Sequence, residues 1–168
     1  MNMEPPRTSP NDRRKIRSLG RSAKRAIKGD LVMTASSLSF RLAVLFVIAG
    51  MAMGIGMAMT QNHAIMPAHA HLNLLGWVSL FLFGIYYERR PRLDASRLAR
   101  VQVYLWSLGT VVLTIAVAAI HLGYPSADPV AGIASLIVLG AMLLFAYFIF
   151  RPATSIAPDV SVRMTPAE

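Results

Sequence analysis

The side chains with the clearest chemical potential are histidines, and three of the four in the chain lie within residues 62–71, NHAIMPAHAH. These are His63, His69 and His71, and the fourth is His121. Neutral imidazole is a common metal ligand, and a pair of axial histidines suits a heme iron. The chain has no cysteine, which excludes disulfides, thiolate metal sites and thiol catalysis. Heme or metal binding through imidazole is therefore the first chemistry to consider.

The segments that carry these histidines are hydrophobic enough to cross a membrane. Hydrophobic residues make up 55% of the 168 residues and gather in four long runs. Each run is close to the roughly 20 residues that a helix needs to cross about 30 Å of hydrocarbon. We therefore predict an all-α integral membrane protein, an up-down-up-down four-helix bundle. The expected spans are residues 40–60, 69–88, 101–122 and 130–150.

The basic residues alternate between the two ends of the predicted bundle. Nine Lys and Arg lie in residues 1–30, five arginines lie in residues 88–100, and two follow the last span. The other two connections, residues 60–69 and 123–129, contain none. By the positive-inside rule, both termini are expected in the cytoplasm of a multi-pass protein of the bacterial inner membrane. Nucleic-acid binding is not expected, because it would need basic surface on a soluble fold.

Three regions follow from this pattern. Residues 1–39 form a basic N-terminal segment, which we expect to be partly disordered. Within it, an amphipathic helix on an anionic leaflet and a solvated basic tail are both compatible with the residues. Residues 40–151 form the transmembrane domain, and residues 152–168 are expected to be a disordered tail.

Topology places all four histidines near the outer interface, and helix periodicity suggests where they point. In the third span a stripe of polar and small residues should face the bundle interior, and it ends at His121. Its members are Ser107, Thr110, Thr114, Ala118 and His121. In the second span, His69 shares a polar and small face with Asn73 and Gly76, whereas His71 lies on nearly the opposite side. Either His69 or His71 could pair with His121 as axial ligands of a heme iron.

Methionines near the same end allow a second interpretation. Met59 and Met66 flank His63, and thioethers together with imidazoles favour Cu(I). Methionine is also an ordinary apolar residue that fills gaps in packing. A copper-handling membrane protein and a cofactor-free membrane scaffold are therefore the alternatives to a heme protein.

The segment HAHLNLLGWVSLFLFGIYY, residues 69–87, resembles the heme-bearing second helix of the heme–copper oxidase subunit I superfamily, which includes cytochrome c oxidases and nitric oxide reductases. The resemblance covers the first two spans and implies a histidine ligand to a low-spin heme, followed by asparagine. A His-x-Asn match assigns that ligand to His71, and the His-x-x-x-Asn form assigns it to His69, with Asn73 in both cases.

The later helices of that family, with the second axial histidine and the copper ligands, have no counterpart here. The chain is therefore not expected to be a complete terminal oxidase or nitric oxide reductase by itself. What the resemblance implies is a heme b protein that acts in respiratory electron transfer, in heme sensing or in support of a respiratory complex. The expected partners are the lipid bilayer and either respiratory subunits or a second copy of the chain.

Overall fold

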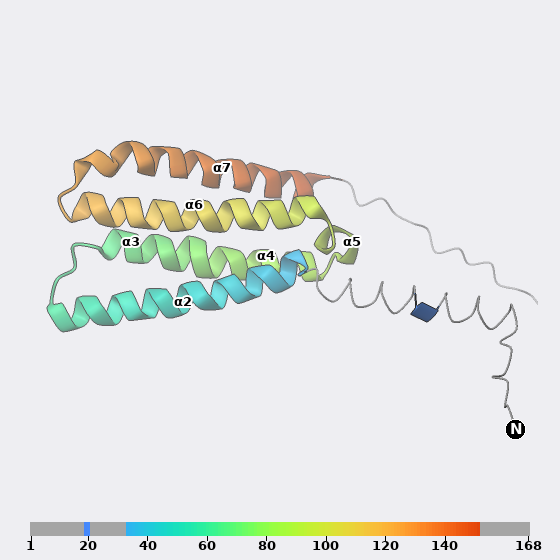
Figure 1. The fold of residues 1–168 in the computed structure, drawn as a ribbon, viewed down its shortest axis with the longest axis horizontal. Helices are drawn as coiled ribbons and strands as arrows, with labels where there is room; N and C mark the ends of the chain where they lie inside the picture. Colours follow the sequence, from blue (N-terminus) through green and yellow to red (C-terminus); the bar gives the residue numbers. More distant parts are fainter. Residues whose placement is uncertain (1–18, 21–32, 152–168) are drawn as a thin grey trace, which may run out of the picture.

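The structure is a computed structural model that describes residues 19–20 and 33–151. Four long helical bodies lie side by side, each antiparallel to the next along the chain (Figure 1). The second body, Met66–Glu88, changes helix type along its length. The elements from the first body onward are α2 (Ala35–Thr60), α3 (Met66–His71), η1 (Leu72–Ser79), α4 (Leu80–Glu88), α5 (Pro91–Asp94), α6 (Arg97–His121), η2 (Pro125–Ala127) and α7 (Asp128–Phe150).

The predicted fold class is confirmed: the described chain is all-helical, and its four long apolar helices pack as a bundle. Each of the four is long and apolar enough to cross a membrane. In hydrocarbon a helix satisfies its own backbone hydrogen bonds, so these four bodies can all span a bilayer. The protein is therefore a multi-pass membrane protein.

Two helices begin earlier than their hydrophobic runs because hydroxyl side chains cap them. α2 begins at Ala35 rather than at residue 40, and α6 begins at Arg97 rather than at residue 101. The Thr34 hydroxyl accepts a hydrogen bond from the backbone N–H three residues on, and the Ser96 hydroxyl does the same. Such N-caps satisfy backbone N–H groups that the helix itself cannot pair. The predicted spans thus missed the polar first turns of both helices.

The connection between the second and third bodies is fastened to the start of α2. Asp94, at the end of the short helix α5, accepts a hydrogen bond from the Ser36 backbone N–H at 2.6 Å. Its other carboxylate oxygen accepts one from the Ser36 hydroxyl at 2.9 Å. A carboxylate is favourable there because the N-terminus of a helix carries partial positive charge. This pair links the two ends of the first hairpin.

The core is assembled from two helix pairs. α2 packs along η1 and α4, and α6 packs along α7. Between the pairs, Phe83 lies edge-to-face against Trp106, with ring centroids 5.0 Å apart, and within 4.3 Å of the Phe145 ring centroid. Buried Tyr87 donates a hydrogen bond to Gln102, which is itself fully buried. Aromatic packing and one buried polar pair therefore join the two hairpins.

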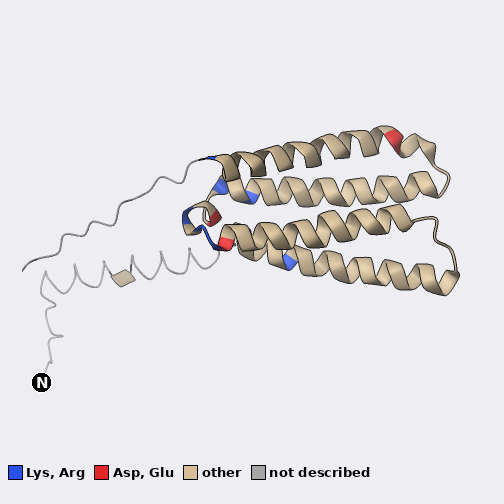
Figure 2. Cartoon of the chain, turned by 180° about the vertical axis from the view of Figure 1, so that it is seen from behind, with Lys and Arg blue, Asp and Glu red and all other residues tan. Residues whose placement is uncertain are grey.

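Charged residues mark the two ends of the bundle differently. Figure 2 shows the basic positions of the described residues toward one end and an acidic position at the other. Asp128 is the first residue of α7. This distribution of charge matches the alternation of basic connections in the sequence. Most of the basic segment predicted for residues 1–39 lies outside the described residues, and its last part, residues 35–39, belongs to α2. The tail predicted for residues 152–168 also lies outside the described residues.

Candidate functional site

The second helical body contains a π-helical segment, η1, in the region where the histidine motif continues. Its backbone offers carbonyl oxygens to side chains. The Trp106 indole N–H donates to the Leu75 carbonyl at 2.9 Å, and the Ser79 hydroxyl donates to the Leu74 carbonyl at 2.9 Å. π-helical turns are rare and occur frequently at functional sites. The histidines at the N-terminal end of this segment are therefore candidate functional residues.

His69 and Asn73 face α2 and are packed tightly against it. A Cβ atom at Gly54 would lie 3.2 Å from the His69 ring, and one at Gly50 would lie 2.6 Å from the Asn73 amide. The Asn73 amide donates to the His69 carbonyl at 2.9 Å and lies 3.3 and 3.4 Å from the two ring nitrogens. His69 therefore points inward, as helix periodicity predicted. It lies in a close contact with α2 that Gly50 and Gly54 allow.

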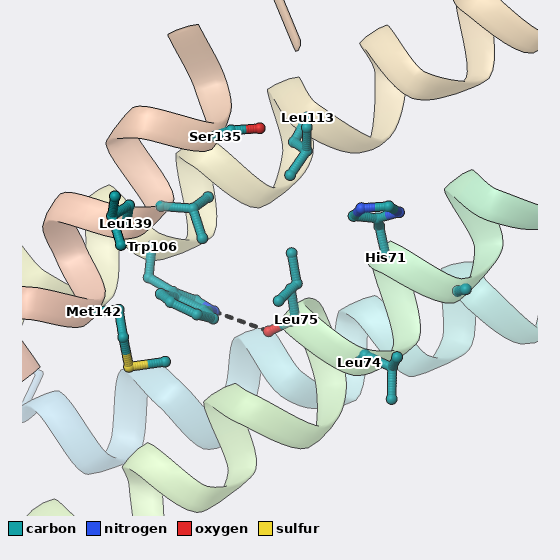
Figure 3. Close-up of a pocket in the computed structure, with 10 residues that line it drawn as sticks. His71, Leu74, Leu75, Trp106, Leu113, Ser135, Leu139 and Met142 are labelled. Carbon is teal, nitrogen blue, oxygen red and sulfur yellow. Dashed lines mark hydrogen bonds between the residues drawn. The ribbon is translucent and has the colours of Figure 1, made fainter. Parts of the chain in front are cut away.

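His71 faces away from α2 and lines an apolar groove between the second helical body, α6 and α7 (Figure 3). The groove has a volume of about 470 Å³, within the usual range for small-molecule sites. Most of its lining is aliphatic, and its other notable side chains are Trp106, Ser135 and Met142. His71 is the only histidine that lines it. The groove thus combines a large apolar surface with a single imidazole.

The His71 ring is held in a defined orientation by the turn before it. Its Nδ1 atom lies 2.7 Å from the carbonyl oxygen of Pro67. When Nδ1 carries the proton and donates it there, Nε2 is left with a free lone pair. Metal-binding histidines very often donate their other ring N–H to a backbone carbonyl, which fixes both tautomer and orientation. His71 therefore has the arrangement of a ligand histidine.

The predicted inward orientation of His121 is wrong. His121 is exposed, and its Nδ1 atom lies 2.9 Å from the Val117 carbonyl. It is the last residue of α6, so the helix ends before its side chain can be covered by a neighbouring helix. His63 is also exposed, in the connection between α2 and α3. Neither of these two histidines lines the groove that contains His71.

The residues named for a copper site do not share a pocket. Met59 is 80% exposed and Met66 is 53% exposed, so both thioethers are largely outside the packed bundle. A second pocket of about 320 Å³ lies near them, but it is lined by Met53 and Met57 and by no histidine. Copper binding by His63, Met59 and Met66 stays a prediction that this arrangement does not favour.

The polar stripe of the third span is confirmed for its first three members. Ser107, Thr110 and Thr114 are buried. The first two donate to the backbone carbonyl four residues earlier, at 2.7 and 2.8 Å. The Thr114 hydroxyl has no hydrogen-bond partner among the described residues. Arg100 Nε is the other buried side-chain polar atom of the described residues that has no hydrogen-bond partner.

Sequence reasoning missed Trp106, Ser135 and Met142 as groove residues. Trp106 carried a signal, because tryptophan in membrane helices usually lies near an interface, whereas this one is about ten residues into α6. A buried indole N–H needs a partner, which here is a carbonyl of η1. Ser135 and Met142 gave no comparable signal, since Ser135 is a single hydroxyl in α7 and Met142 is one of many apolar residues in that helix.

The described histidines do not form a metal-ligand cluster with carboxylates. No group of three or more His, Asp or Glu side chains that could hold a metal ion occurs within residues 33–151. A heme iron has four ligands from its own macrocycle, so the protein needs to supply only an axial ligand and an apolar pocket. Among the described residues, His71 is the histidine that borders an apolar groove.

No protein-family model, curated protein or solved structure matches the chain.

Proposed function

We propose that the protein is an integral membrane heme protein in which His71 is an axial ligand to a b-type heme held in the groove between η1, α6 and α7. The single observation that carries the proposal is the setting of His71. Its Nδ1 atom is engaged by the Pro67 carbonyl at 2.7 Å, and its ring borders an apolar groove of about 470 Å³. A bound heme would supply one-electron redox chemistry, and the chain would supply the ligand, the apolar walls and the orientation.

The same geometry supports a choice between the two candidate ligands. His69 lies against Gly54 of α2, where a close helix contact leaves little room for a macrocycle. His71 borders open groove volume on its side of the helix. His71 is therefore the proposed ligand, with His69 and Asn73 as packing partners of α2.

The role that we propose follows from the resemblance to the first helices of heme–copper oxidase subunit I. It is respiratory electron transfer, heme sensing or support of a respiratory complex, in the bacterial inner membrane. The arginines near one end of the bundle favour an orientation with that end and both termini in the cytoplasm. His71, at the start of the second helical body, would then lie toward the outer face.

The test is the visible spectrum of the detergent-purified protein produced with a heme supply. We expect heme with a Soret band to co-purify with the wild-type protein, to be lost in His71→Gly, and to be retained by that variant when heme and free imidazole are supplied together. Retention of protein-bound heme with imidazole, after free heme has been removed, is expected where imidazole replaces a missing ligand side chain. His69→Ala and His121→Ala serve as matched histidine controls and should retain heme.

Two outcomes would contradict this proposal at different levels. A colourless wild-type protein after heme supplementation would exclude heme binding altogether. A Soret band that survives in His71→Gly but is lost in His69→Ala would keep the heme and move the ligand to the face that packs on α2. Copper determination on the same sample tests the copper alternative.

A further inference from the structure

The end of the bundle that carries the arginines has a charge that its own acidic residues do not balance. Among residues 33–151, seven arginines lie in the half of the bundle that contains this end, against Glu88 and Asp94. Asp94 accepts hydrogen bonds from Ser36, so it is already occupied. The arginines are Arg41, Arg89, Arg90, Arg92, Arg97, Arg100 and Arg151. Excess positive charge at this level calls for an anionic partner.

Arg90 is held in place at the end of α7. Its guanidinium carbon lies 4.3 Å from the centroid of the Tyr86 ring. One of its nitrogens donates to the Tyr86 hydroxyl and, at 3.3 Å, to the Phe148 carbonyl. The Tyr86 hydroxyl donates to the same carbonyl at 2.9 Å. A guanidinium has five N–H donors, so these contacts fix the group and leave further donors for a ligand.

Arg151 lies at the same end of α7 as the Phe148 carbonyl that Arg90 contacts. It follows the last residue of α7, and its guanidinium carbon lies 5.8 Å from the Tyr147 ring centroid. Tyr147 is the neighbour in sequence of Phe148, whose carbonyl Arg90 contacts. Two arginines stacked on two tyrosines are thus gathered around one helical turn.

We propose that Arg90 and Arg151 bind the headgroup phosphate of an anionic phospholipid at the C-terminal turn of α7. Guanidinium groups match phosphate oxygens with paired hydrogen bonds, and arginine is favoured over lysine where that geometry matters. Tyrosines at the ends of membrane helices lie at headgroup depth, which is where a lipid phosphate is found. Basic clusters beside membrane helices bind anionic lipids for the same reasons.

The surroundings favour a lipid over free phosphate. Phe150, next to Arg151, is 84% exposed, and Ile149 and Tyr147 are exposed beside it. These exposed apolar side chains belong to the last turn of α7, next to Arg151 in sequence. A phospholipid can place its phosphate on the arginines and its acyl chains on this surface, whereas inorganic phosphate gains only the first contact. The proposal does not depend on heme binding or on which leaflet the arginines face.

Native mass spectrometry of the full-length protein in detergent, with phosphatidylglycerol or phosphatidylcholine added, tests the site. We expect bound phosphatidylglycerol in preference to phosphatidylcholine, and at least a tenfold weaker affinity in Arg90→Gln/Arg151→Gln. Arg92→Gln/Arg97→Gln removes the same charge from exposed positions elsewhere at this end and is the matched control. It should lose much less affinity than the first pair.

Equal losses in the two double variants would overturn the proposal, because they would show general attraction rather than a site. Equal binding of the two lipids would overturn it as well. Displacement of the lipid by millimolar inorganic phosphate would show a free-anion site and reject the lipid assignment. Should Arg90→Gln impair folding through its contact with Phe148, the single variant Arg151→Gln carries the test, since its exposed side chain lies beyond the end of α7.

Discussion

Asn73 of η1 and Gly50 of α2 are in such close contact that a Cβ atom at Gly50 would lie 2.6 Å from both the nitrogen and the oxygen of the Asn73 side-chain amide. Small residues allow membrane helices to approach closely, and here one makes room for a polar side chain. The amide in turn donates to the His69 carbonyl at 2.9 Å. The position of the histidine-bearing helix against α2 therefore depends on a glycine in the neighbouring helix.

Gly50→Ala should destabilise the bundle, because the added methyl group overlaps the Asn73 amide. We expect a loss of about 1–3 kcal/mol, the usual range for an overpacked site, seen as a lower thermal midpoint in detergent. Gly56→Ala is the matched control in the same helix, since a Cβ there meets nothing within 4 Å. Asn73→Ala in the Gly50→Ala background should recover part of the loss. Equal midpoints for the two glycine variants would show that the contact is looser than described.

Buried Tyr87 and Gln102 should contribute to the stability of the bundle as a coupled pair. The Tyr87 hydroxyl donates to the Gln102 side-chain oxygen at 2.9 Å, and the Gln102 amide donates to the Ala141 carbonyl at 3.3 Å. Tyr87→Phe leaves the buried amide oxygen unpaired, which should cost about 1–3 kcal/mol. Tyr87→Phe/Gln102→Leu should be less destabilised than the sum of the two single variants. Additive losses in an unfolding double-mutant cycle would contradict the pairing.

Hydropathy alone was enough to predict four spans, because a membrane helix must be apolar over a fixed length. Periodicity also predicted which face of the second helix carries His69 and Asn73, since small residues mark the side on which helices approach. The same reasoning failed at His121, because a stripe along a helix does not reveal where the neighbouring helix stops covering it.

Other features depend on information that the sequence pattern does not carry. The π-helical segment Leu72–Ser79 has the same hydrophobic composition as an ordinary membrane helix, so nothing in its residues set it apart. The groove beside His71 exists because the second body and α7 lie apart at that level. Their separation results from the packing of α6 between them. The early starts of α2 and α6 rest on hydroxyl caps that a hydropathy window leaves out.

Thr114→Val should stabilise the bundle or leave it unchanged. The Thr114 hydroxyl is buried and has no partner among the described residues, and valine has nearly the same shape without the unpaired group. Removing such a group should raise stability by up to about 1 kcal/mol. Thr110→Val is the matched control, because the Thr110 hydroxyl donates to the Trp106 carbonyl at 2.8 Å. Loss of that hydrogen bond should lower stability. A larger loss in Thr114→Val than in Thr110→Val would reveal a partner for the Thr114 hydroxyl.

The proposed orientation can be read out by single cysteines, because the natural chain contains none and gives no background. Ala95 is exposed in the connection near the arginine end, and Ser126 is exposed in the connection at the opposite end. With the arginine end in the cytoplasm, a membrane-impermeant maleimide added to intact spheroplasts should label Ser126→Cys at once. Ala95→Cys should react only after the membrane is permeabilised.

The reverse labelling pattern would place the arginine end outside the cell and His71 toward the cytoplasm. Labelling of both cysteines in intact spheroplasts would show two orientations of one chain. Added positive charge tests whether the distribution of charge sets the orientation. Two lysines inserted beside Ser126 should weaken the bias, because retention of positive charge in the cytoplasm is what sets the orientation. A labelling pattern that ignores the added lysines would mean that the packing of the bundle, rather than its charge, fixes the topology.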